Sequence, residues 1–211
     1  GRSFVEKLGD LNYFLVGSGA LGCEFVKNFA LCGVCCGPEG SLTIADADRI
    51  ELSNLTRQFL FREHNVGQSK ALAAAAMATN PGGRTRAPPM NEHLKVTCYE
   101  AYVGPATEAA PFTDAFWEGL DGVCNALDNM EARFYVDRTC VMFEKSLLES
   151  GTMGTSGNVR SRRFEVLRCL HFFNTTRVHL TMTWVVSFST LRLFGPFPVN
   201  TMLHTGPDLP E

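Results

Sequence analysis

Three glycines near the start of the sequence have the spacing of a turn that binds phosphate. Gly17, Gly19 and Gly22 follow the pattern G-x-G-x-x-G. In such a turn the first glycine allows a tight exit from a strand, the second lets the backbone approach a phosphate, and the third lets the next helix pack closely on the sheet. The N-terminus of that helix offers unpaired N–H groups and its positive dipole end to an anion. The spacing predicts a nucleotide site, although many unrelated nucleotide-binding proteins share the motif.

Carboxylates follow two further apolar stretches. Asp46 comes after residues 41–45, about two dozen residues beyond the glycines, where an acid binds the ribose hydroxyls of a nucleotide. The alternative interpretation of Asp46 is a solvent-facing acid at the end of a strand. Asp128 lies near the end of the apolar stretch that starts at Gly122. Ligands of parallel α/β sheets bind at the carboxyl ends of the strands, so we expect the glycine turn, Asp46 and Asp128 to share one crevice.

Positioning these residues requires strands that all end at the same edge of a sheet. Strands and helices alternate along the sequence. This alternation predicts an α/β fold, with a Rossmann-like, mostly parallel sheet and helices on both faces. The predicted strands are residues 13–16, 41–45, 95–103 and 122–129 and a short strand starting at 147, and the predicted helices are residues 3–8, 24–31, 64–79, 112–120 and 132–144.

Composition is typical of a globular chain with one domain, or one domain and an appendage. The 211 residues are 45% hydrophobic and 19% charged, and the net charge of −3 gives no reason to expect binding to nucleic acid. The sequence has no signal peptide and does not predict a membrane protein, and it begins with Gly, so we expect a fragment of a longer intracellular protein. The eight cysteines lack the spacing of a disulfide framework, which favours free thiols.

Four blocks of sequence closely resemble the active adenylation half of ubiquitin-activating enzymes. They are Y-F-L-V-G-S-G-A-L-G-C-E, S-N-L-T-R-Q-F-L-F-R, N-A-L-D-N-M-E-A-R and L-L-E-S-G-T-M-G-T-S-G-N. The blocks occur in the family's order within residues 2–158, and bacterial sulfur-carrier adenylyltransferases share the fold more distantly. The resemblance implies an ATP-binding adenylation domain of the ThiF type, present in part, over residues 1–158.

The resemblance also implies a site for ATP and Mg²⁺, to which the family adds an arginine from its inactive half or a partner subunit. Catalysis falls to Arg57, Lys70 and Asp128, and the magnesium ligands are Asp128 first and Asp48 second. Asp46 takes the ribose and Val103 flanks the adenine. The nucleotide contacts implied in this way are Gly17, Gly19, Ala20, Gly22, Asp46, Asn54, Arg57, Gln58, Lys70, Val103 and Asp128.

The adenylation reaction that the resemblance implies explains why these residue types are needed. A ubiquitin-like C-terminal carboxylate must attack the α-phosphate of ATP, and both partners are anionic. Arg57 and Lys70 offset that repulsion, so no side chain has to act as a nucleophile. The partners implied are ubiquitin or a ubiquitin-like protein, an inactive adenylation half and a ubiquitin-conjugating enzyme, in the cytoplasm and nucleus. Cys23, Cys124 and Cys140 lie on elements predicted to be buried, and no cysteine matches the family's thioester nucleophile.

Residues 159–211 depart from the family and are predicted to be a divergent tail. Our hypothesis is read-through or mis-spliced sequence, and the alternative is a strand–helix pair that completes the sheet. Cys169 lies in this tail. Within the resembling region, Thr56, Ser146 and Ser156 replace the family's usual residues, and we expect altered loops rather than altered chemistry.

Two other functions fit part of the pattern. An NAD-linked oxidoreductase would use the same glycine turn and Asp46, but it gives no role to Arg57, Lys70 and Asp128 together. A non-catalytic fragment would bind nucleotide and dock on a partner half. Single charged residues also have ordinary explanations: Arg57 as a surface ion-pair residue and Lys70 as a solvated helix residue. Asn54 has the ordinary explanation of a helix N-cap before Leu55.

Overall fold

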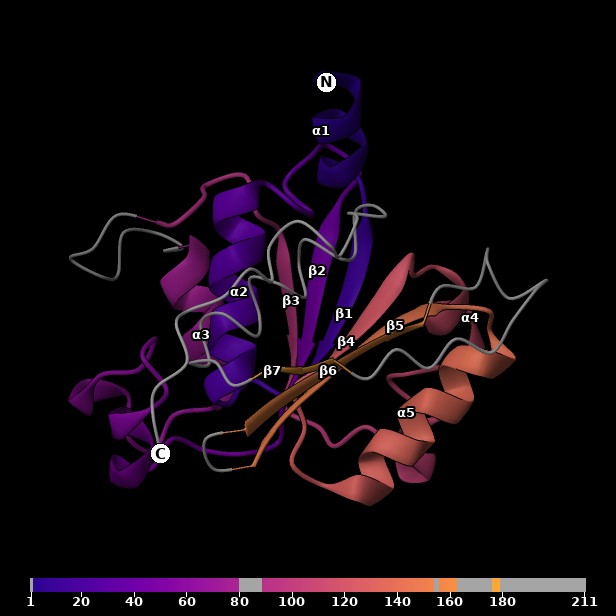
Figure 1. Cartoon of the computed structure of the whole chain (residues 1–211). Coiled ribbons are helices and arrows are strands. Elements are labelled where there is room, and N and C mark those ends of the chain that lie inside the picture. Colours follow the sequence, from indigo (N-terminus) through magenta and orange to yellow (C-terminus); the bar gives the residue numbers. More distant parts are fainter. Residues whose placement is uncertain (1, 80–88, 154–155, 163–175, 179–211) are drawn as a thin grey trace, which may run out of the picture.

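The computed structural model describes residues 2–79, 89–153, 156–162 and 176–178. These residues form one sheet with helices against it (Figure 1). The strands are β1 (Asn12–Val16), β2 (Ser41–Ala45), β3 (Val96–Tyr99), β4 (Gly122–Asn125), β5 (Ser146–Met153), β6 (Ser156–Arg162) and β7 (Thr176–Val178). The helices are α1 (Arg2–Gly9), α2 (Ala20–Cys32), α3 (Lys70–Thr79), α4 (Asp114–Glu118) and α5 (Met130–Met142), with 3₁₀ turns at η1 (Leu52–Thr56), η2 (Glu63–Asn65) and η4 (Pro105–Thr107).

The described strands are hydrogen-bonded in the order β3-β2-β1-β4-β5-β6-β7. The first five are parallel to one another, whereas β6 is antiparallel to β5 and β7 is antiparallel to β6. The chain therefore has the predicted α/β, Rossmann-like, mostly parallel sheet. Strand order reverses at β1, since β2 lies on one side of it and β4 on the other. An open α/β sheet binds its ligands at the carboxyl ends of the strands beside such a reversal.

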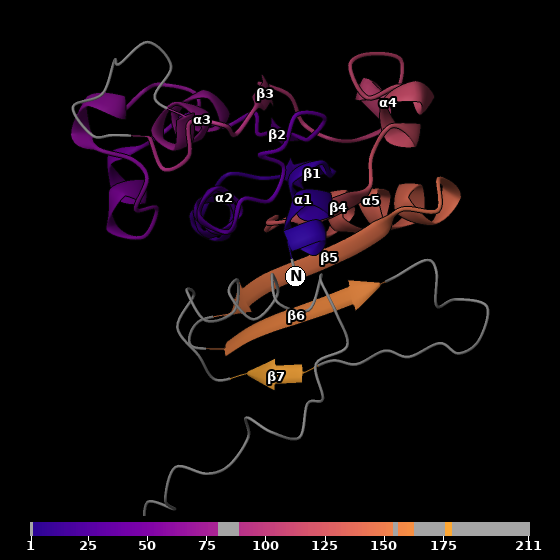
Figure 2. The ribbon, with the colours of Figure 1, turned by 90° about the horizontal axis from the view of Figure 1, so that it is seen from above.

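Helices cover both faces of the parallel part of the sheet, as predicted (Figure 2). Helices α2 and α3 lie on one face, where Phe25 and Phe29 are buried against the sheet with Ile44 of β2. Helices α4 and α5 lie on the other face, where Phe14 of β1 packs edge-on against Trp117 of α4, with ring centroids 5.6 Å apart. Each face thus has its own apolar core, and the strands between them are held from both sides.

The third helix starts later than its alanine-rich sequence predicts. The prediction covered residues 64–79, but α3 begins at Lys70 and residues 63–65 form the separate turn η2. The interruption lies at Gly67, whose φ of +85° is left-handed and ends any right-handed helix. Ser69 then forms an isolated β-bridge with Arg49. This bridge places Lys70 in the first turn of α3, next to the chain that follows β2.

Other elements differ from prediction mainly at their ends. Strand β4 stops at Asn125 rather than 129, because the chain must turn into α5, where the Asn129 side chain accepts a hydrogen bond from the N–H of Glu131 at 2.8 Å. Strand β3 is shorter than residues 95–103, and α4 is shorter than residues 112–120. Strand β5 runs to Met153 and is longer than the short strand predicted from 147.

The predicted domain boundary after Asn158 falls inside β6. Asn158 pairs with Gly151 of β5, and residues 159–162 continue the same strand. Residues 163–175 and 179–211, with Cys169, lie outside the described residues, so the assignment of the tail stays a prediction. No helix in the described part of the chain is long and apolar enough to cross a membrane.

Candidate functional site

The glycine turn joins β1 to α2 and brings backbone very close to backbone. Gly17 has a φ of +93°, and a Cβ at this position would lie 2.6 Å from the carbonyl oxygen of Ala126. A Cβ at Gly22 would lie 2.3 Å from the carbonyl oxygen of Gly17. Neither position has room for a side chain. A Cβ at Gly19, by contrast, would meet only the amide nitrogen of Gln58 at 3.7 Å.

Helix α2 begins directly behind this turn with an open N-terminus. Its N-cap is Gly19, which supplies no side-chain hydrogen bond to the first turn. The N–H groups at Ala20 and its neighbours therefore point at the carboxyl edge of the sheet, where an anion would complete their hydrogen bonds. The helix is 13 residues long, which gives it a developed dipole.

Asp46, at the end of β2, is held by three hydrogen bonds. One carboxylate oxygen, Oδ2, accepts from the backbone N–H of Ser18 at 2.7 Å and from its hydroxyl at 2.9 Å. The other, Oδ1, accepts from the N–H of Asp48 at 2.8 Å. These bonds fix the carboxylate beside the glycine turn, and each oxygen keeps acceptor capacity. Sequence reasoning missed Ser18, which is fully buried inside the motif itself.

Lys70 and Asp48 form an ion pair, with Nζ and Oδ2 2.8 Å apart. The Lys70 side chain is 11% exposed, so it is not the solvated helix residue of the alternative interpretation. Asp48 is 52% exposed, and its other oxygen accepts from the Tyr102 hydroxyl at 3.4 Å. The predicted phosphate-binding lysine and the second predicted magnesium ligand thus lie in contact, each neutralising the charge of the other.

The segment after β2 places Asn54, Arg57 and Gln58 in different surroundings. Asn54 is buried and its Oδ1 accepts from the N–H of Glu51 at 3.0 Å, so it closes a turn that Glu51 caps. Asn54 is therefore not the N-cap of a helix starting at Leu55. Arg57 is exposed, donates to the carbonyl of Ser53 at 3.1 Å, and has no carboxylate within 4.0 Å among the described residues. Gln58 is 3% exposed. Its Oε1 is buried and has no partner in the described part of the chain.

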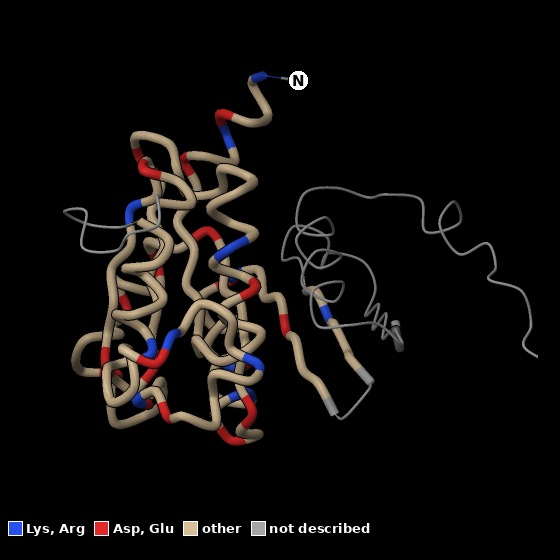
Figure 3. Tube along the Cα trace, turned by 90° about the vertical axis from the view of Figure 1, so that its left-hand side faces the viewer, with Lys and Arg blue, Asp and Glu red and all other residues tan. Residues whose placement is uncertain are grey.

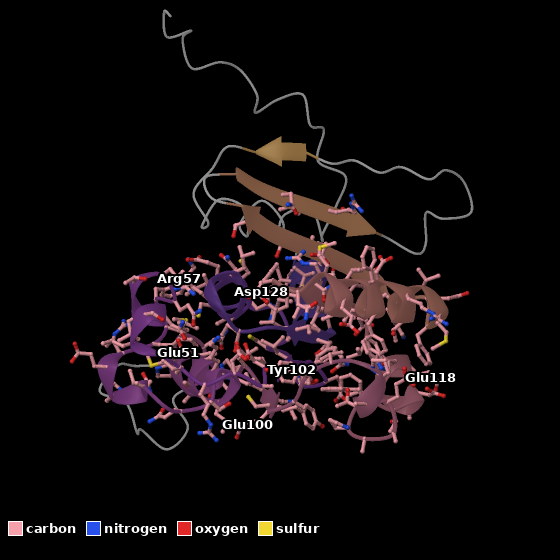
Figure 4. All side chains as sticks on the ribbon, turned by 90° about the horizontal axis from the view of Figure 1, so that it is seen from below. Glu51, Arg57, Glu100, Tyr102, Glu118 and Asp128 are labelled. Carbon is pink, nitrogen blue, oxygen red and sulfur yellow. The ribbon has the colours of Figure 1, made fainter. Side chains whose placement is uncertain are left out.

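The carboxyl ends of the parallel strands open into a cleft of about 1270 Å³. Figure 3 shows acidic and basic positions interleaved at the lower end of the tube, where these strands finish in Figure 1. Figure 4 views this end of the molecule and labels Arg57, Asp128 and Tyr102 on three different segments. Ten of the predicted residues line the cleft: Gly17, Gly19, Ala20, Asp46, Asp48, Arg57, Gln58, Lys70, Val103 and Asp128.

Two predicted contacts, Gly22 and Asn54, do not line the cleft. Gly22 packs behind the turn, against Gly17. Asn54 accepts the N–H groups of Arg57 and Gln58 on its carbonyl oxygen, at 3.1 and 2.9 Å. Each therefore supports residues that do face the cleft.

Sequence reasoning also missed a charged pair on the wall of the cleft. Arg133 of α5 forms an ion pair with Glu149 of β5 and donates a hydrogen bond to the carbonyl of Leu127. Burial lowers the pKa of Arg133, and the charge of Asp128 opposes that shift. Arg133 and Glu149 belong to two of the four blocks named above, and membership in those blocks was the available signal.

The described cysteines do not provide a reactive thiolate in the cleft. Burial raises the pKa of Cys23 to about 12, and it raises that of Cys124 well above the ordinary value. Cys140 is buried as well. Among the described residues, no group of three His, Cys, Asp or Glu side chains is placed to hold a metal ion, so a cation here would share its coordination with a ligand or water.

Comparisons with known proteins agree with the resemblance. The chain is 51% identical over 160 residues to human "Ubiquitin-like modifier-activating enzyme 1", and the match covers 76% of this chain and 14% of the relative. It is 52% identical over 161 residues to "Ubiquitin-activating enzyme E1 1" of Arabidopsis thaliana and 49% identical over 160 residues to the Dictyostelium discoideum relative, again over 76% of the chain. The chain spans about a seventh of these relatives' length. The sequence profile of the ThiF family matches residues 1–186, and the chain belongs to that family.

Proposed function

We propose that the cleft binds ATP with Mg²⁺ for the adenylation of a C-terminal carboxylate on ubiquitin or a ubiquitin-like protein. The observation that carries the proposal is the lining of one cleft by the glycine turn, Asp46, Lys70, Arg57 and Asp128. A dinucleotide site needs the first two features only. Two cations and a strand-end carboxylate beside them suit a triphosphate with its metal.

The donor set of the cleft fits this ligand. The N–H groups at the start of α2 and the cations Lys70 and Arg57 suit phosphate oxygens. Asp46 keeps lone pairs for ribose hydroxyls, and Val103, which is 7% exposed, offers an apolar wall for a base. Asp128 and Asp48 are the hard oxygen ligands that hold a magnesium ion.

The side chains in this proposal act by charge and position. ATP with Mg²⁺ supplies an activated phosphorus and a counter-charge for the departing pyrophosphate. Lys70 exchanges its bond to Asp48 for one to phosphate, and this exchange leaves Asp48 free for the metal. Arg57, which has no acidic partner among the described residues, lowers the repulsion between an incoming carboxylate and the phosphates. No side chain is required to transfer a proton or form a covalent bond.

The full reaction needs parts that we assign to other regions of the parent enzyme. The relatives are named as ubiquitin-activating enzymes and are about seven times longer than the matched segment. We place the thioester-forming cysteine and the surface for a ubiquitin-conjugating enzyme in those regions, and the inactive adenylation half either in the same parent chain or in a partner subunit. The 51% identity to an enzyme named for ubiquitin-like modifiers supports ubiquitin or a close relative as the substrate.

Pyrophosphate exchange into ATP tests the proposal. The chain is assayed with ubiquitin, without ubiquitin, and with an inactive half supplied separately. Exchange that depends on both ATP and ubiquitin is the expected result. Lys70→Ala and Asp128→Ala should each lower it by about tenfold or more, because each removes a charge on the reacting phosphates or their metal.

A control and two contrary results complete this experiment. Lys7→Ala changes an exposed lysine of α1, away from the cleft, and should leave exchange unaltered. Tighter binding of NAD than of ATP would contradict the proposal and favour an oxidoreductase. ATP binding with no ubiquitin-dependent exchange, even with the inactive half present, would point to a non-catalytic nucleotide-binding fragment.

A further inference from the structure

Arg133 joins three elements on the wall of the cleft. Its guanidinium, on a side chain 16% exposed, donates from Nη2 to the carbonyl of Leu127 and pairs through Nη1 with Oε1 of Glu149. The second oxygen of Glu149 accepts from the side-chain amide of Asn125 at 2.7 Å. The hydroxyl of Ser150 donates to the carbonyl of Asn125 at 2.7 Å. A chain of polar contacts thus runs from α5 through β5 to the end of β4.

This chain of contacts holds the loop that carries Asp128 in place. Residues 126–129 connect β4 to α5, and Leu127 directly precedes Asp128. On the other side of the loop, the N–H of Ala126 donates to the carbonyl of Val16 at 2.8 Å. Among the described residues the carboxylate of Asp128 makes no hydrogen bond, so its direction is set by the backbone of its loop.

Gly151 of β5 gives the guanidinium a flat surface to lie on. A Cβ at this position would lie 3.1 Å from Nη2 and 3.3 Å from Nη1 of Arg133, and 3.3 Å from Oδ1 of Asn158. Gly151 and Asn158 are paired across β5 and β6. The block L-L-E-S-G-T-M-G-T-S-G-N therefore supplies both the carboxylate that pairs with Arg133 and the bare backbone beneath it.

We propose that Arg133 is a positioning residue, which with Glu149 fixes the Asp128 loop and so sets how strongly Mg²⁺ enhances nucleotide binding in the cleft. The inference rests on the proposed function, since it needs a nucleotide and a metal there. The arrangement resembles outer groups that orient metal ligands, whose loss typically lowers metal affinity by about 10- to 100-fold. Without Arg133, the Leu127 carbonyl loses its side-chain donor, and Glu149 loses its ion pair and keeps the hydrogen bond from the Asn125 amide.

Calorimetric titration of ATP, with Mg²⁺ and with EDTA, measures the relevant quantity. The readouts are the ratio of these two dissociation constants and the Mg²⁺ concentration that gives half of the enhancement, which is found by repeating the ATP titration at a series of Mg²⁺ concentrations. Thermal melting is recorded for every variant. Arg133→Met keeps a long unbranched side chain but removes the charge and the donors. We expect about a tenfold or greater rise in the Mg²⁺ concentration needed for half-maximal enhancement, and a Mg²⁺-free affinity within about twofold of the original. Arg133→Lys keeps a charge and should recover part of the effect.

Two comparisons separate positioning from general destabilisation. Arg138→Met changes an exposed arginine on the same helix and should alter neither constant. In an Asp128→Asn background, Arg133→Met should add little, because both changes act on the same metal contact and their effects are then non-additive. Gly151→Ala, which presses on the guanidinium, should shift the Mg²⁺ dependence in the same direction as Arg133→Met.

Each contrary outcome has a distinct meaning. Equal losses of affinity with and without Mg²⁺, or additive effects of Arg133→Met and Asp128→Asn, would overturn the positioning role alone. If Arg133→Met does not fold, the same ratios measured on Arg133→Lys and Gly151→Ala decide the matter. Failure of the unaltered chain to bind ATP more tightly with Mg²⁺ than with EDTA would overturn the proposed function, and this inference with it.

Discussion

At the scale of single residues, the two candidate magnesium ligands differ in what already occupies them. Asp48 is committed to Lys70 at 2.8 Å and also accepts from Tyr102. Asp128 is exposed and lines the cleft, and among the described residues no cation lies within ion-pair distance of it, although its charge acts on Arg133. A carboxylate without a bound cation is the more available ligand for a metal. Asp128 should therefore contribute more to magnesium binding than Asp48.

Replacing each acid by its amide tests this difference. Asp128→Asn should raise the Mg²⁺ concentration needed for ATP binding by about tenfold or more. Asp48→Asn should have a smaller effect on Mg²⁺, because it also frees Lys70 for phosphate. Titration of Mg²⁺ at fixed ATP gives both numbers. A larger loss with Asp48→Asn than with Asp128→Asn would reverse the assignment.

Residue types in the cleft were predictable, but their pairings were not. The motif spacing and the strand ends placed the glycine turn, Asp46 and Asp128 in one crevice, and all three line the cleft. The pairing of Lys70 with Asp48 and of Arg133 with Glu149 depends on contacts between segments far apart in sequence. Local pattern carries no information on such contacts. For the same reason, the burial of the Asn54 side chain and its hydrogen bond from the N–H of Glu51 were not predicted.

At the scale of elements, two glycines of the β1–α2 turn have different roles, one in packing and one at the cleft. At Gly22 an added carbon would meet the backbone oxygen of Gly17 at 2.3 Å, and backbone cannot rotate away as a side chain can. At Gly19 the nearest atom would be 3.7 Å away, an ordinary contact. Gly22 is thus required by packing, whereas Gly19 leaves space on the side of the cleft.

Alanine at each position should separate folding from binding. Gly22→Ala should lower the free energy of unfolding by about 1–3 kcal/mol, the usual cost of an overpacked site. Gly19→Ala should leave that free energy within about 0.5 kcal/mol. It should weaken ATP binding, because in the proposed site the added methyl group would take up space in the turn that approaches the phosphates. Urea denaturation and ATP titration measure the two effects. Equal stability losses at both positions would argue against this division.

Element types followed from pattern, whereas element ends followed from conformation. The alanine run in α3 predicts a helix, because alanine has the highest helix propensity, and the predicted helix starts at residue 64. Gly67 breaks the helix there through its left-handed φ of +85°, which composition alone does not reveal. The extent of β5 also escaped prediction, because its length is fixed by pairing with β6.

At the scale of the whole molecule, two apolar cores hold several thiols away from water. Cys23 of α2 is buried in the core on one face of the sheet, and Cys140 of α5 is buried in the core on the other face. Burial raises the pKa of Cys23 from its ordinary 9.0 to about 12 and that of Cys98 to about 11. The folded chain therefore holds these protons at a pH where the unfolded chain releases them.

The linked prediction is a loss of stability at alkaline pH. Since the pKa of Cys23 is raised in the folded state, its contribution is complete below about pH 9 and is lost as pH rises toward 12. Thermal melting from pH 7 to 11 should show a falling midpoint above about pH 9. Cys23→Ala should make that fall shallower. An identical pH dependence in the variant and the unaltered chain would show that Cys23 does not contribute.

The contact between Gly17 and the carbonyl of Ala126 has a consequence for how the cleft discriminates among ligands. Gly17 belongs to the turn between β1 and α2, and Ala126 belongs to the loop between β4 and α5 that carries Asp128. Because no side chain lies between them, the two segments pack backbone against backbone at this point. The two sides of the cleft cannot be brought closer at this point, and one added carbon at position 17 would push them apart. Glycine at position 17 thereby sets the distance between the turn and the loop that carries Asp128.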